Sequence, residues 1–182
     1  KDEKMLLNQG TLKLLKNQEK TVDLVRIRER CRQKELTKSE CYNAFQKAGF
    51  HYGETFRGIE KLYFNQNEAL AEIHFMLNEE GYLVHPGLLD SALQAVAGLN
   101  SIRHGDMAQL PYVIEKCVIR KEVTQKMWSY VQCREDKGRI QYDIELCDEQ
   151  GKSLISIYGY SMRSLKKADH SKEQVKEELL IM

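Results

Sequence analysis

The most informative segment of this chain is HPGLLDSALQAVAGLN, residues 85–100. Pro86 suits the first position of a helix, and we expect one central helix from Pro86 to about Ile102. Apolar side chains cover nearly every face of this helix: Leu88, Leu89, Ala92, Leu93, Val96, Ala97 and Leu99. A helix that is apolar all round is buried and does not lie on the surface.

Two polar residues, Asp90 and Gln94, interrupt this apolar helix. They are four positions apart, so we expect both side chains on one face. Burying an unpaired carboxylate is costly, and three interpretations of Asp90 are open. It pairs with a cation elsewhere in the chain, it faces a cavity, or it is a functional acid whose pKa is raised.

The segments on both sides of the helix alternate with the period of a β-strand. We predict strands over residues 56–64, 68–77, 111–119, 127–135, 139–148 and 153–165, and a short strand over 11–15. A short helix is predicted over residues 23–36, and a second begins at the Thr37–Glu40 capping box and ends at Gly49. An antiparallel sheet with one core helix must wrap around that helix to bury it. We therefore expect an α+β hotdog fold, with five to seven strands around one long central helix.

Composition narrows the classes of partner. The 182 residues include 42% hydrophobic and 30% charged residues, with a formal net charge of +1, as in an ordinary globular domain. Neither nucleic acid nor an anionic membrane is indicated as a partner, and no apolar run approaches the length of a membrane helix. The five cysteines are widely spaced with no C-x-x-C pair, which favours reduced thiols in a cytoplasmic protein over disulfides or zinc. Because the chain does not begin with Met, we expect a piece of a longer polypeptide.

Three segments carry a resemblance to a known family. HPGLLDSALQ resembles the D-x-x-x-Q/H motif of polyketide synthase dehydratase domains in its usual context. GFHYGETF, residues 49–56, is similar to the family's G-Y-x-Y-G-P-x-F motif, and LPYVIEKCVI, residues 110–119, resembles the LPF segment that follows the helix. The segments occur in family order, and the resemblance covers roughly residues 20–166. It implies the C-terminal half of a double hotdog, from a modular bacterial synthase.

The resemblance also implies a reaction. Such a domain removes water from a 3-hydroxyacyl chain carried on the phosphopantetheine of an acyl carrier protein, with no directly bound cofactor and no metal. Matched motif by motif, Asp90 is the general acid, Gln94 orients the acid or the substrate hydroxyl, and Tyr52 is a candidate hydroxyl donor. Residues of the substrate tunnel would be Gly53, Phe56, His85, Pro86, Leu110, Pro111 and Tyr112. The expected partners are the acyl carrier protein with its polyketide intermediate, the N-terminal hotdog and a second copy in a homodimer.

The sequence departs from the family pattern in two places. Glu54 replaces the proline of the tyrosine motif, and the H-x-x-x-G-x-x-x-x-P motif of the catalytic base does not occur in these 182 residues. None of the histidines, which are His51, His74, His85, His104 and His170, can be assigned as the base. We expect residues 1–20 to be the last strand of a preceding hotdog with its linker, residues 21–166 the C-terminal hotdog, and residues 167–182 a charged linker.

Three functions are compatible with this pattern. The first is the acid-bearing half of a dehydratase, which we expect to be inactive alone. The second is a non-catalytic half-domain that holds an acyl chain or an acyl carrier protein. The third is a double-bond isomerase or cyclase variant of the same fold, against which Asp90 argues mildly. The histidine motif upstream of Lys1 in the parent gene would favour the first, and its absence the second.

Overall fold

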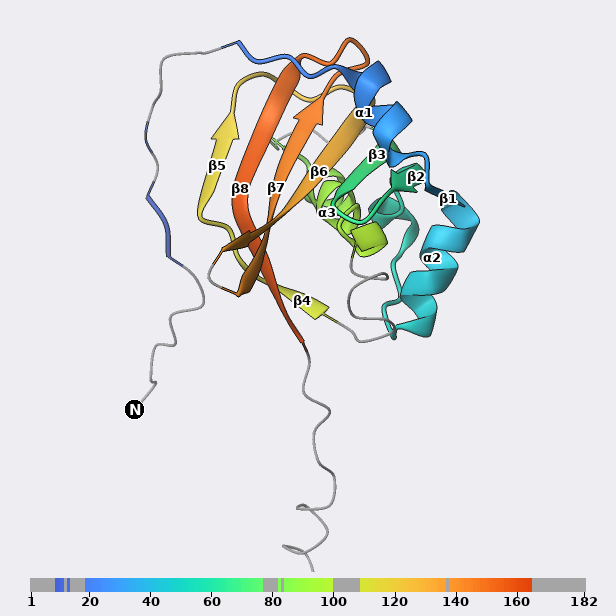
Figure 1. Ribbon diagram of the computed structural model, residues 1–182. Helices are drawn as coiled ribbons and strands as arrows, with labels where there is room; N and C mark the ends of the chain where they lie inside the picture. Colours follow the sequence, from blue (N-terminus) through green and yellow to red (C-terminus); the bar gives the residue numbers. More distant parts are fainter. Residues whose placement is uncertain are drawn as a thin grey trace, which may run out of the picture.

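The computed structural model describes residues 9–11, 13, 19–76, 82, 84–99, 109–136 and 138–164 (Figure 1). In chain order, the elements are α1 (Leu24–Cys31), β1 (Lys34–Thr37), α2 (Lys38–Lys47), the 3₁₀ turn η1 (Glu54–Phe56), β2 (Ile59–Phe64), β3 (Glu68–His74), α3 (Pro86–Gln94), β4 (Gln109–Val113), β5 (Lys116–Ile119), β6 (Lys126–Asp136), β7 (Arg139–Cys147) and β8 (Ser153–Ser164). The linker predicted over residues 167–182 lies outside the described residues. So does the strand predicted over residues 11–15, except for Thr11 and Lys13, which belong to no strand.

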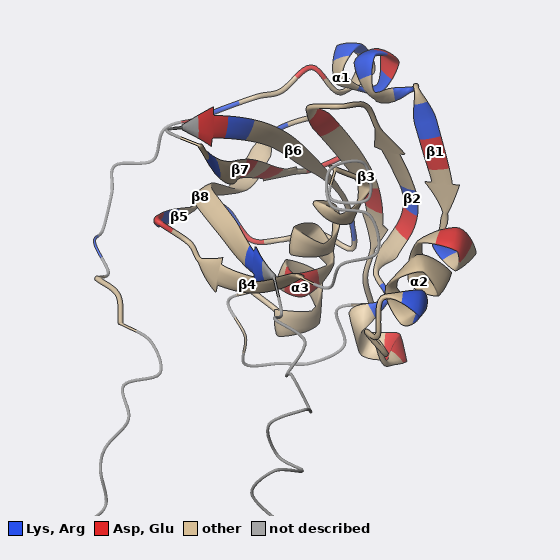
Figure 2. Ribbon diagram, turned by 60° about the horizontal axis from the view of Figure 1, so that its bottom comes forward, with Lys and Arg blue, Asp and Glu red and all other residues tan. Residues whose placement is uncertain are grey.

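The strands form one antiparallel sheet that curves around α3. Its order is β1-β2-β3-β6-β7-β8-β4, and β5 also pairs with β8. Figure 2 shows the sheet surrounding α3, with α2 beside the β2 end. The hotdog prediction is confirmed. The described residues contain eight strands, more than the five to seven expected, because β1 was not foreseen and the segment 111–119 divides between β4 and β5.

The core lies between α3 and the concave face of the sheet. Leu88 and Ala92 of α3 have no exposed surface and belong to one cluster with strand residues such as Leu62, Ile144 and Ile157. Each fully buried Leu or Ile side chain contributes about 1.5–3 kcal/mol relative to exposure. This burial holds α3, and with it Asp90, at a fixed depth in the fold.

The regular part of the central helix is shorter than the sequence predicts, because α3 ends at Gln94. The Val96 N–H donates to the Leu93 carbonyl at 3.1 Å, and the Leu99 N–H donates to the Val96 carbonyl at 3.0 Å. These bonds span three residues and mark a turn at residues 95–96, after which residues 97–99 are helical again. The expected helix to Ile102 is therefore not continuous, because this turn interrupts it, and residues 100–108 lie outside the described residues.

The capping box before α2 is confirmed. The Glu40 N–H donates to the Thr37 hydroxyl, and the Glu40 carboxylate accepts from the Thr37 N–H. The helix predicted over residues 23–36, by contrast, ends at Cys31, and Lys34–Thr37 forms strand β1. Pairing of β1 with β2 gives this segment its conformation, and such non-local pairing overrides local helix propensity.

The predicted strand 111–119 is divided because β8 bends at Gly159. Gly159 has φ +63°, and a Cβ there would lie 2.4 Å from a carboxylate oxygen of Glu115. β5 pairs with β8 before this bend and β4 pairs with it after the bend. One continuous partner strand cannot follow both directions, so two short strands take its place.

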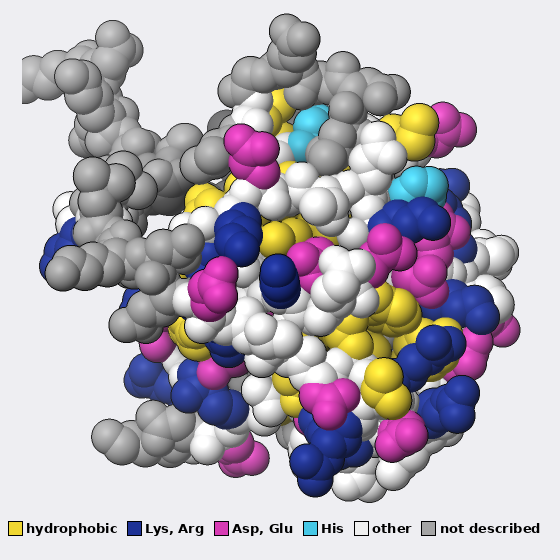
Figure 3. All heavy atoms as spheres, turned by 90° about the horizontal axis from the view of Figure 1, so that it is seen from above, with side chains coloured by type: hydrophobic (Ala, Val, Ile, Leu, Met, Phe, Trp, Pro, Cys, Tyr) yellow, Lys and Arg dark blue, Asp and Glu magenta, His cyan; other side chains and the backbone are white. Residues whose placement is uncertain are grey.

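The convex face of the sheet carries α1, whose Ile27 and Cys31 pack on Tyr63 and Leu70. Figure 3 shows a face of the molecule on which basic and acidic side chains are interspersed, in line with the net charge of +1. Of the helices that the structure describes, none has the length and apolar character needed to cross a membrane.

Candidate active site

The start of α3 fixes the direction in which Asp90 projects. His85 is the N-cap residue, and its Nδ1 accepts a hydrogen bond of 3.1 Å from the Gly87 N–H. Gly87 is buried against η1, where a Cβ would lie 2.3 Å from the Thr55 carbonyl oxygen. Only glycine allows this approach, which presses the first turn of α3 onto the loop after Tyr52.

Asp90 and Gln94 lie on one face of α3, as the sequence predicts. Gln94 Nε2 donates to Asp90 Oδ2 at 2.7 Å and to the Phe56 carbonyl at 3.0 Å. The Gln94 Oε1 accepts a 3.0 Å hydrogen bond from the Tyr42 hydroxyl, whose oxygen accepts from the Ile59 N–H at 3.1 Å. Both hydrogen-bonding ends of the Gln94 amide are therefore satisfied, and one of them is directed at Asp90.

Burial raises the pKa of Asp90 above the ordinary value of 3.8, and the hydrogen bond from Gln94 opposes this shift. The aspartate is half-buried, and it forms no ion pair with any described residue. Of the three interpretations of Asp90, pairing with a cation therefore fails within the described part of the chain. A carboxyl group without a counter-ion and with a raised pKa retains its proton to a higher pH than an exposed aspartate.

Asp90 faces a cavity of about 360 Å³ between α2, α3 and the β4–β8 end of the sheet. Apolar side chains form most of its wall, and the lining residues are Leu36, Cys41, Ala44, Phe45, Ala48, Phe50, Tyr52, Leu62, Asp90, Leu93, Gln94, Val96, Ala97, Gln109, Leu110, Pro111, Tyr160 and Met162. Burial, with a smaller contribution from the charge of Asp90, raises the pKa of Tyr52 to about 12. Tyr52 is therefore a neutral hydroxyl at physiological pH, able to donate a hydrogen bond in the cavity.

Five of the ten predicted site residues line this cavity: Tyr52, Asp90, Gln94, Leu110 and Pro111. The structure places the others elsewhere: Gly53, Phe56, His85, Pro86 and Tyr112. Phe56 contributes its carbonyl oxygen to Gln94, and the Tyr112 ring lies 3.3 Å from the Arg163 guanidinium carbon. These five residues do not line the cavity formed by this chain, so their role in a substrate tunnel stays a prediction.

Two tyrosines of the site were missed by the sequence reasoning. Tyr42 lies on α2 next to Cys41, a member of the helix's apolar stripe, and Tyr160 lies on β8 among apolar residues. Both are buried, and burial raises the pKa of each above 10. The sequence offered one signal for these residues, a tyrosine placed among apolar residues. A buried tyrosine hydroxyl usually has a polar partner, so such a position indicates a hydrogen bond in the core.

Within the described residues, no histidine lies on the cavity wall. His51 and His74 are exposed, and His85 is used as the cap of α3. His104 and His170 lie outside the described residues. The described site thus holds a candidate acid and no candidate base.

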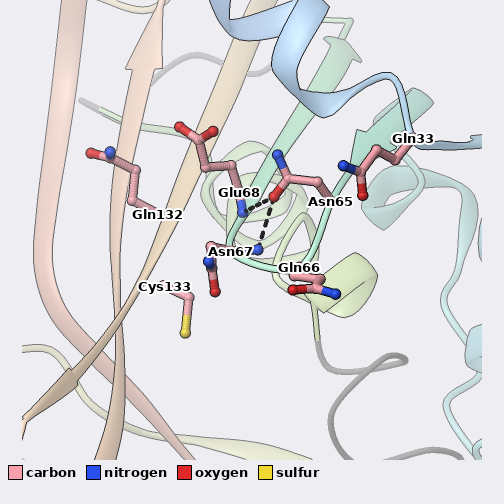
Figure 4. Close-up of a pocket in the computed structure, with 7 residues that line it drawn as sticks. All are labelled: Gln33, Asn65, Gln66, Asn67, Glu68, Gln132 and Cys133. Atoms are coloured by element: carbon pink, nitrogen blue, oxygen red, sulfur yellow. Dashed lines mark hydrogen bonds between the residues drawn. The ribbon is translucent and has the colours of Figure 1, made fainter.

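A second hollow, of about 540 Å³, lies at the β2–β3 turn (Figure 4). It is lined by Gln33, Asn65, Gln66, Asn67, Glu68, Gln132 and Cys133. Asn65 Oδ1 accepts from the N–H groups of Asn67 and Glu68, each at 2.8 Å, which stabilises the turn. Its only carboxylate, Glu68, is paired with Arg30. Of the two hollows, only the one at Asp90 combines an apolar wall with an unpaired carboxyl group.

Comparison with known proteins gives a consistent result. Residues 19–172 match the family model described as the polyketide synthase dehydratase N-terminal domain. The chain is 35% identical over 167 residues to polyketide synthase PksM and 37% identical over 150 residues to PksN, both of Bacillus subtilis. It aligns over 85% and 79% of its own length, but over only 4% and 3% of these synthases.

Solved structures agree with the fold. A trans-AT polyketide synthase dehydratase domain from Brevibacillus brevis superposes with a TM-score of 0.74 at 30% identity, covering 81% of this chain and 54% of that domain. An inactive CurK dehydratase mutant, in which asparagine replaces an aspartate, superposes with a TM-score of 0.71 at 27% identity and the same coverage. The chain thus spans about half of the solved dehydratase domains that it resembles.

Proposed function

The chain belongs to the polyketide synthase dehydratase family, and on that premise we propose that it supplies the general acid, Asp90, of a 3-hydroxyacyl dehydratase. The observation that carries the proposal is the position of Asp90. It is a half-buried carboxyl group without a counter-ion among the described residues, at the wall of a largely apolar cavity, with Gln94 donating to it at 2.7 Å. An inactive CurK dehydratase with asparagine in place of an aspartate supports the need for one carboxyl group in this fold.

The elimination requires two proton transfers on opposite sides of one carbon–carbon bond. A base removes the proton from Cα, and the electron pair of that C–H bond forms the Cα–Cβ double bond. The Cβ–O bond breaks, and the hydroxyl leaves as water with the proton of Asp90. A raised pKa suits Asp90 to this role, because an acid must hold its proton until the leaving group needs it. Gln94 then donates to the carboxylate that remains.

We assign the chain to the aspartate-bearing, C-terminal hotdog of a two-hotdog dehydratase. The motif HPGLLDSALQ supports this assignment, and so does the coverage of about half of each solved domain. The family model that matches is described as the N-terminal domain, so the assignment rests on the motif residues. The base is then a histidine of the other hotdog.

The remaining parts of the proposal follow from this chemistry. The substrate is a polyketide intermediate held by the phosphopantetheine of an acyl carrier protein, and Asp90 and Gln94 act without a directly bound cofactor or metal. The natural partners are that carrier protein and the other hotdog, and the reaction takes place in the cytoplasm. The antiparallel edge at β4 and β5 exposes Tyr112, Ile114 and Ile119, which gives such partners an apolar surface.

A second function, non-catalytic binding of an acyl chain, is favoured by one observation. The base motif is absent from the 182 residues, whereas the apolar cavity is present without it. Such a module would retain the substrate through the cavity and leave it unchanged.

One assay separates the two functions. The complete polypeptide that contains this chain is incubated with 3-hydroxyacyl thioesters on an acyl carrier protein, and the acyl mass is followed by mass spectrometry. The dehydratase proposal predicts loss of one water with the complete polypeptide and none with the 182-residue chain. Retention of the acyl carrier protein without any loss of water would support the binding module. Equal turnover by the 182-residue chain would place the base among its own five histidines.

A further inference from the structure

A continuous chain of hydrogen bonds links the backbone of β2 to the carboxyl group of Asp90. It runs from the Ile59 N–H to the Tyr42 hydroxyl at 3.1 Å, from that hydroxyl to Gln94 Oε1 at 3.0 Å, and from Gln94 Nε2 to Asp90 Oδ2 at 2.7 Å. Tyr42 and Gln94 are both buried, with 7% and 5% of their surface exposed. The chain therefore runs through the interior, where water does not replace a missing partner.

Tyr42 has one hydroxyl proton, and the surrounding groups decide where it points. The Ile59 N–H can only donate, so the Tyr42 oxygen accepts from it and the hydroxyl proton is free for another acceptor. Two acceptors lie in reach, namely Gln94 Oε1 at 3.0 Å and the Phe56 carbonyl at 3.4 Å. The shorter contact is to Gln94, and the Phe56 carbonyl already accepts from Gln94 Nε2. The hydroxyl proton therefore points to Gln94.

This contact matters because a glutamine amide has two orientations. In the observed one, the NH₂ group faces two acceptors, Asp90 Oδ2 and the Phe56 carbonyl. In the reversed one, an oxygen would face those acceptors and the NH₂ group would face Tyr42. The Tyr42 proton favours the first orientation, since it requires an oxygen opposite it.

We propose that Tyr42 is a positioning residue of the dehydratase, which holds the Gln94 amide so that its N–H is always directed at the Asp90 carboxyl group. The catalytic consequence rests on the proposed function. When Asp90 gives up its proton, a donor in place stabilises the carboxylate that forms, which makes Asp90 a stronger acid. Without the Tyr42 hydroxyl, the amide loses the hydrogen bond that fixes its Oε1, so its N–H is held less firmly at Asp90.

Other titratable groups around Asp90 do not compete with this effect. Tyr52 faces the cavity from the loop before η1, Tyr160 faces it from β8, and Cys41 faces it from α2. Burial raises the pKa of each of them, so all three are neutral in the range where Asp90 titrates. His85, on the α3 N-cap, is directed at Gly87 by its Nδ1.

The test is Tyr42→Phe in the complete polypeptide, with steady-state dehydration kinetics measured against pH. We expect kcat to fall about tenfold, less than the roughly 10²–10⁴ that a positioned acid contributes, with little change in KM. The alkaline limb of the pH profile, which reports loss of the Asp90 proton, should move to higher pH because a donor to the carboxylate has been weakened. A double-mutant cycle gives the decisive readout: in a Gln94→Leu background, Tyr42→Phe should cause no further loss of kcat.

Tyr63→Phe is the matched control. Tyr63 is also buried and its hydroxyl accepts from Arg28 at 2.8 Å, but it lies on the α1 side of the sheet, in a separate cluster from α3. The substitution Tyr63→Phe should leave kcat and the pH profile of dehydration unchanged. If Tyr42→Phe does not fold, 3-fluorotyrosine at position 42 retains the hydroxyl and should move the alkaline limb to lower pH, because it is a stronger donor.

The proposal is overturned if Tyr42→Phe matches Tyr63→Phe, if it reduces kcat equally in the Gln94→Leu background, or if the fluorinated protein has the wild-type profile. A wild-type polypeptide that does not dehydrate its substrate would instead contradict the proposed function. The two failures are therefore distinguishable.

Discussion

The Arg30–Glu68–Tyr130 cluster, on the convex face of the sheet, gives a stability prediction that is independent of the active site. Arg30 donates to both carboxylate oxygens of Glu68, from Nε at 2.8 Å and from Nη2 at 2.7 Å, and the Tyr130 hydroxyl donates to the same group. These contacts join α1 to β3 and β6. The Arg30 guanidinium is the largest cause that lowers the pKa of Glu68, from 4.5 to about 2.

The magnitude follows from this pKa difference. It corresponds to about 3 kcal/mol of preference for the ionised carboxylate in the folded state. The Arg30 side chain is 42% exposed, so solvent screens the pair, and we expect Glu68→Gln to cost about 1.5 kcal/mol at neutral pH. A folded-state pKa below the unfolded one stabilises the protein above pH 4.5, and this contribution is lost as the pH falls towards 2.

Urea denaturation followed by circular dichroism measures this effect at neutral pH and at several values below pH 5. The difference in unfolding free energy between wild type and Glu68→Gln should shrink as the pH falls. Glu35→Gln is the control, because its pair with Lys61 is 3.3 Å long with both side chains nearly half exposed, and it should cost less than about 0.5 kcal/mol. Equal effects of the two substitutions, or a difference that persists unchanged in acid, would refute the reasoning.

Two further predictions concern the site. Gly87→Ala places a Cβ 2.3 Å from the Thr55 carbonyl and should cost about 1–3 kcal/mol in thermal or urea unfolding, whereas Gly53→Ala, with nothing within 4 Å, should be neutral within about 0.5 kcal/mol. The alkaline limb of the pH profile of dehydration, which reports loss of the Asp90 proton, should lie above the ordinary aspartate range, because burial raises the pKa of Asp90. A decline that begins below pH 4 would contradict this assignment of the acid.

Much of the fold was accessible from local sequence signals. The Pro86 start of α3, the Thr37–Glu40 capping box and the shared face of Asp90 and Gln94 depend on residues within a few positions of each other. The period-two segments likewise located most strands, although β3 ends at His74 and not at residue 77.

The features that were not predicted depend on distant pairing. Strand β1 exists because of its register with β2, and the break between β4 and β5 depends on the bend of β8 at Gly159. The contact of Tyr42 with Gln94 joins residues 52 positions apart. Local patterns carry no information on such pairs, since their geometry is created only when α2 and α3 pack in the same core.

The most direct test of the central proposal is Asp90→Asn, with dehydration and melting temperature measured on the same preparation of the complete polypeptide. Asparagine preserves the volume and can still accept from Gln94, but it has no carboxylic proton to give to a leaving hydroxyl. Because burial disfavours the charged aspartate, we expect a melting temperature equal to or above that of the wild type, together with loss of dehydration. A folded Asp90→Asn protein that removes water at the wild-type rate would contradict the assignment of Asp90 as the acid.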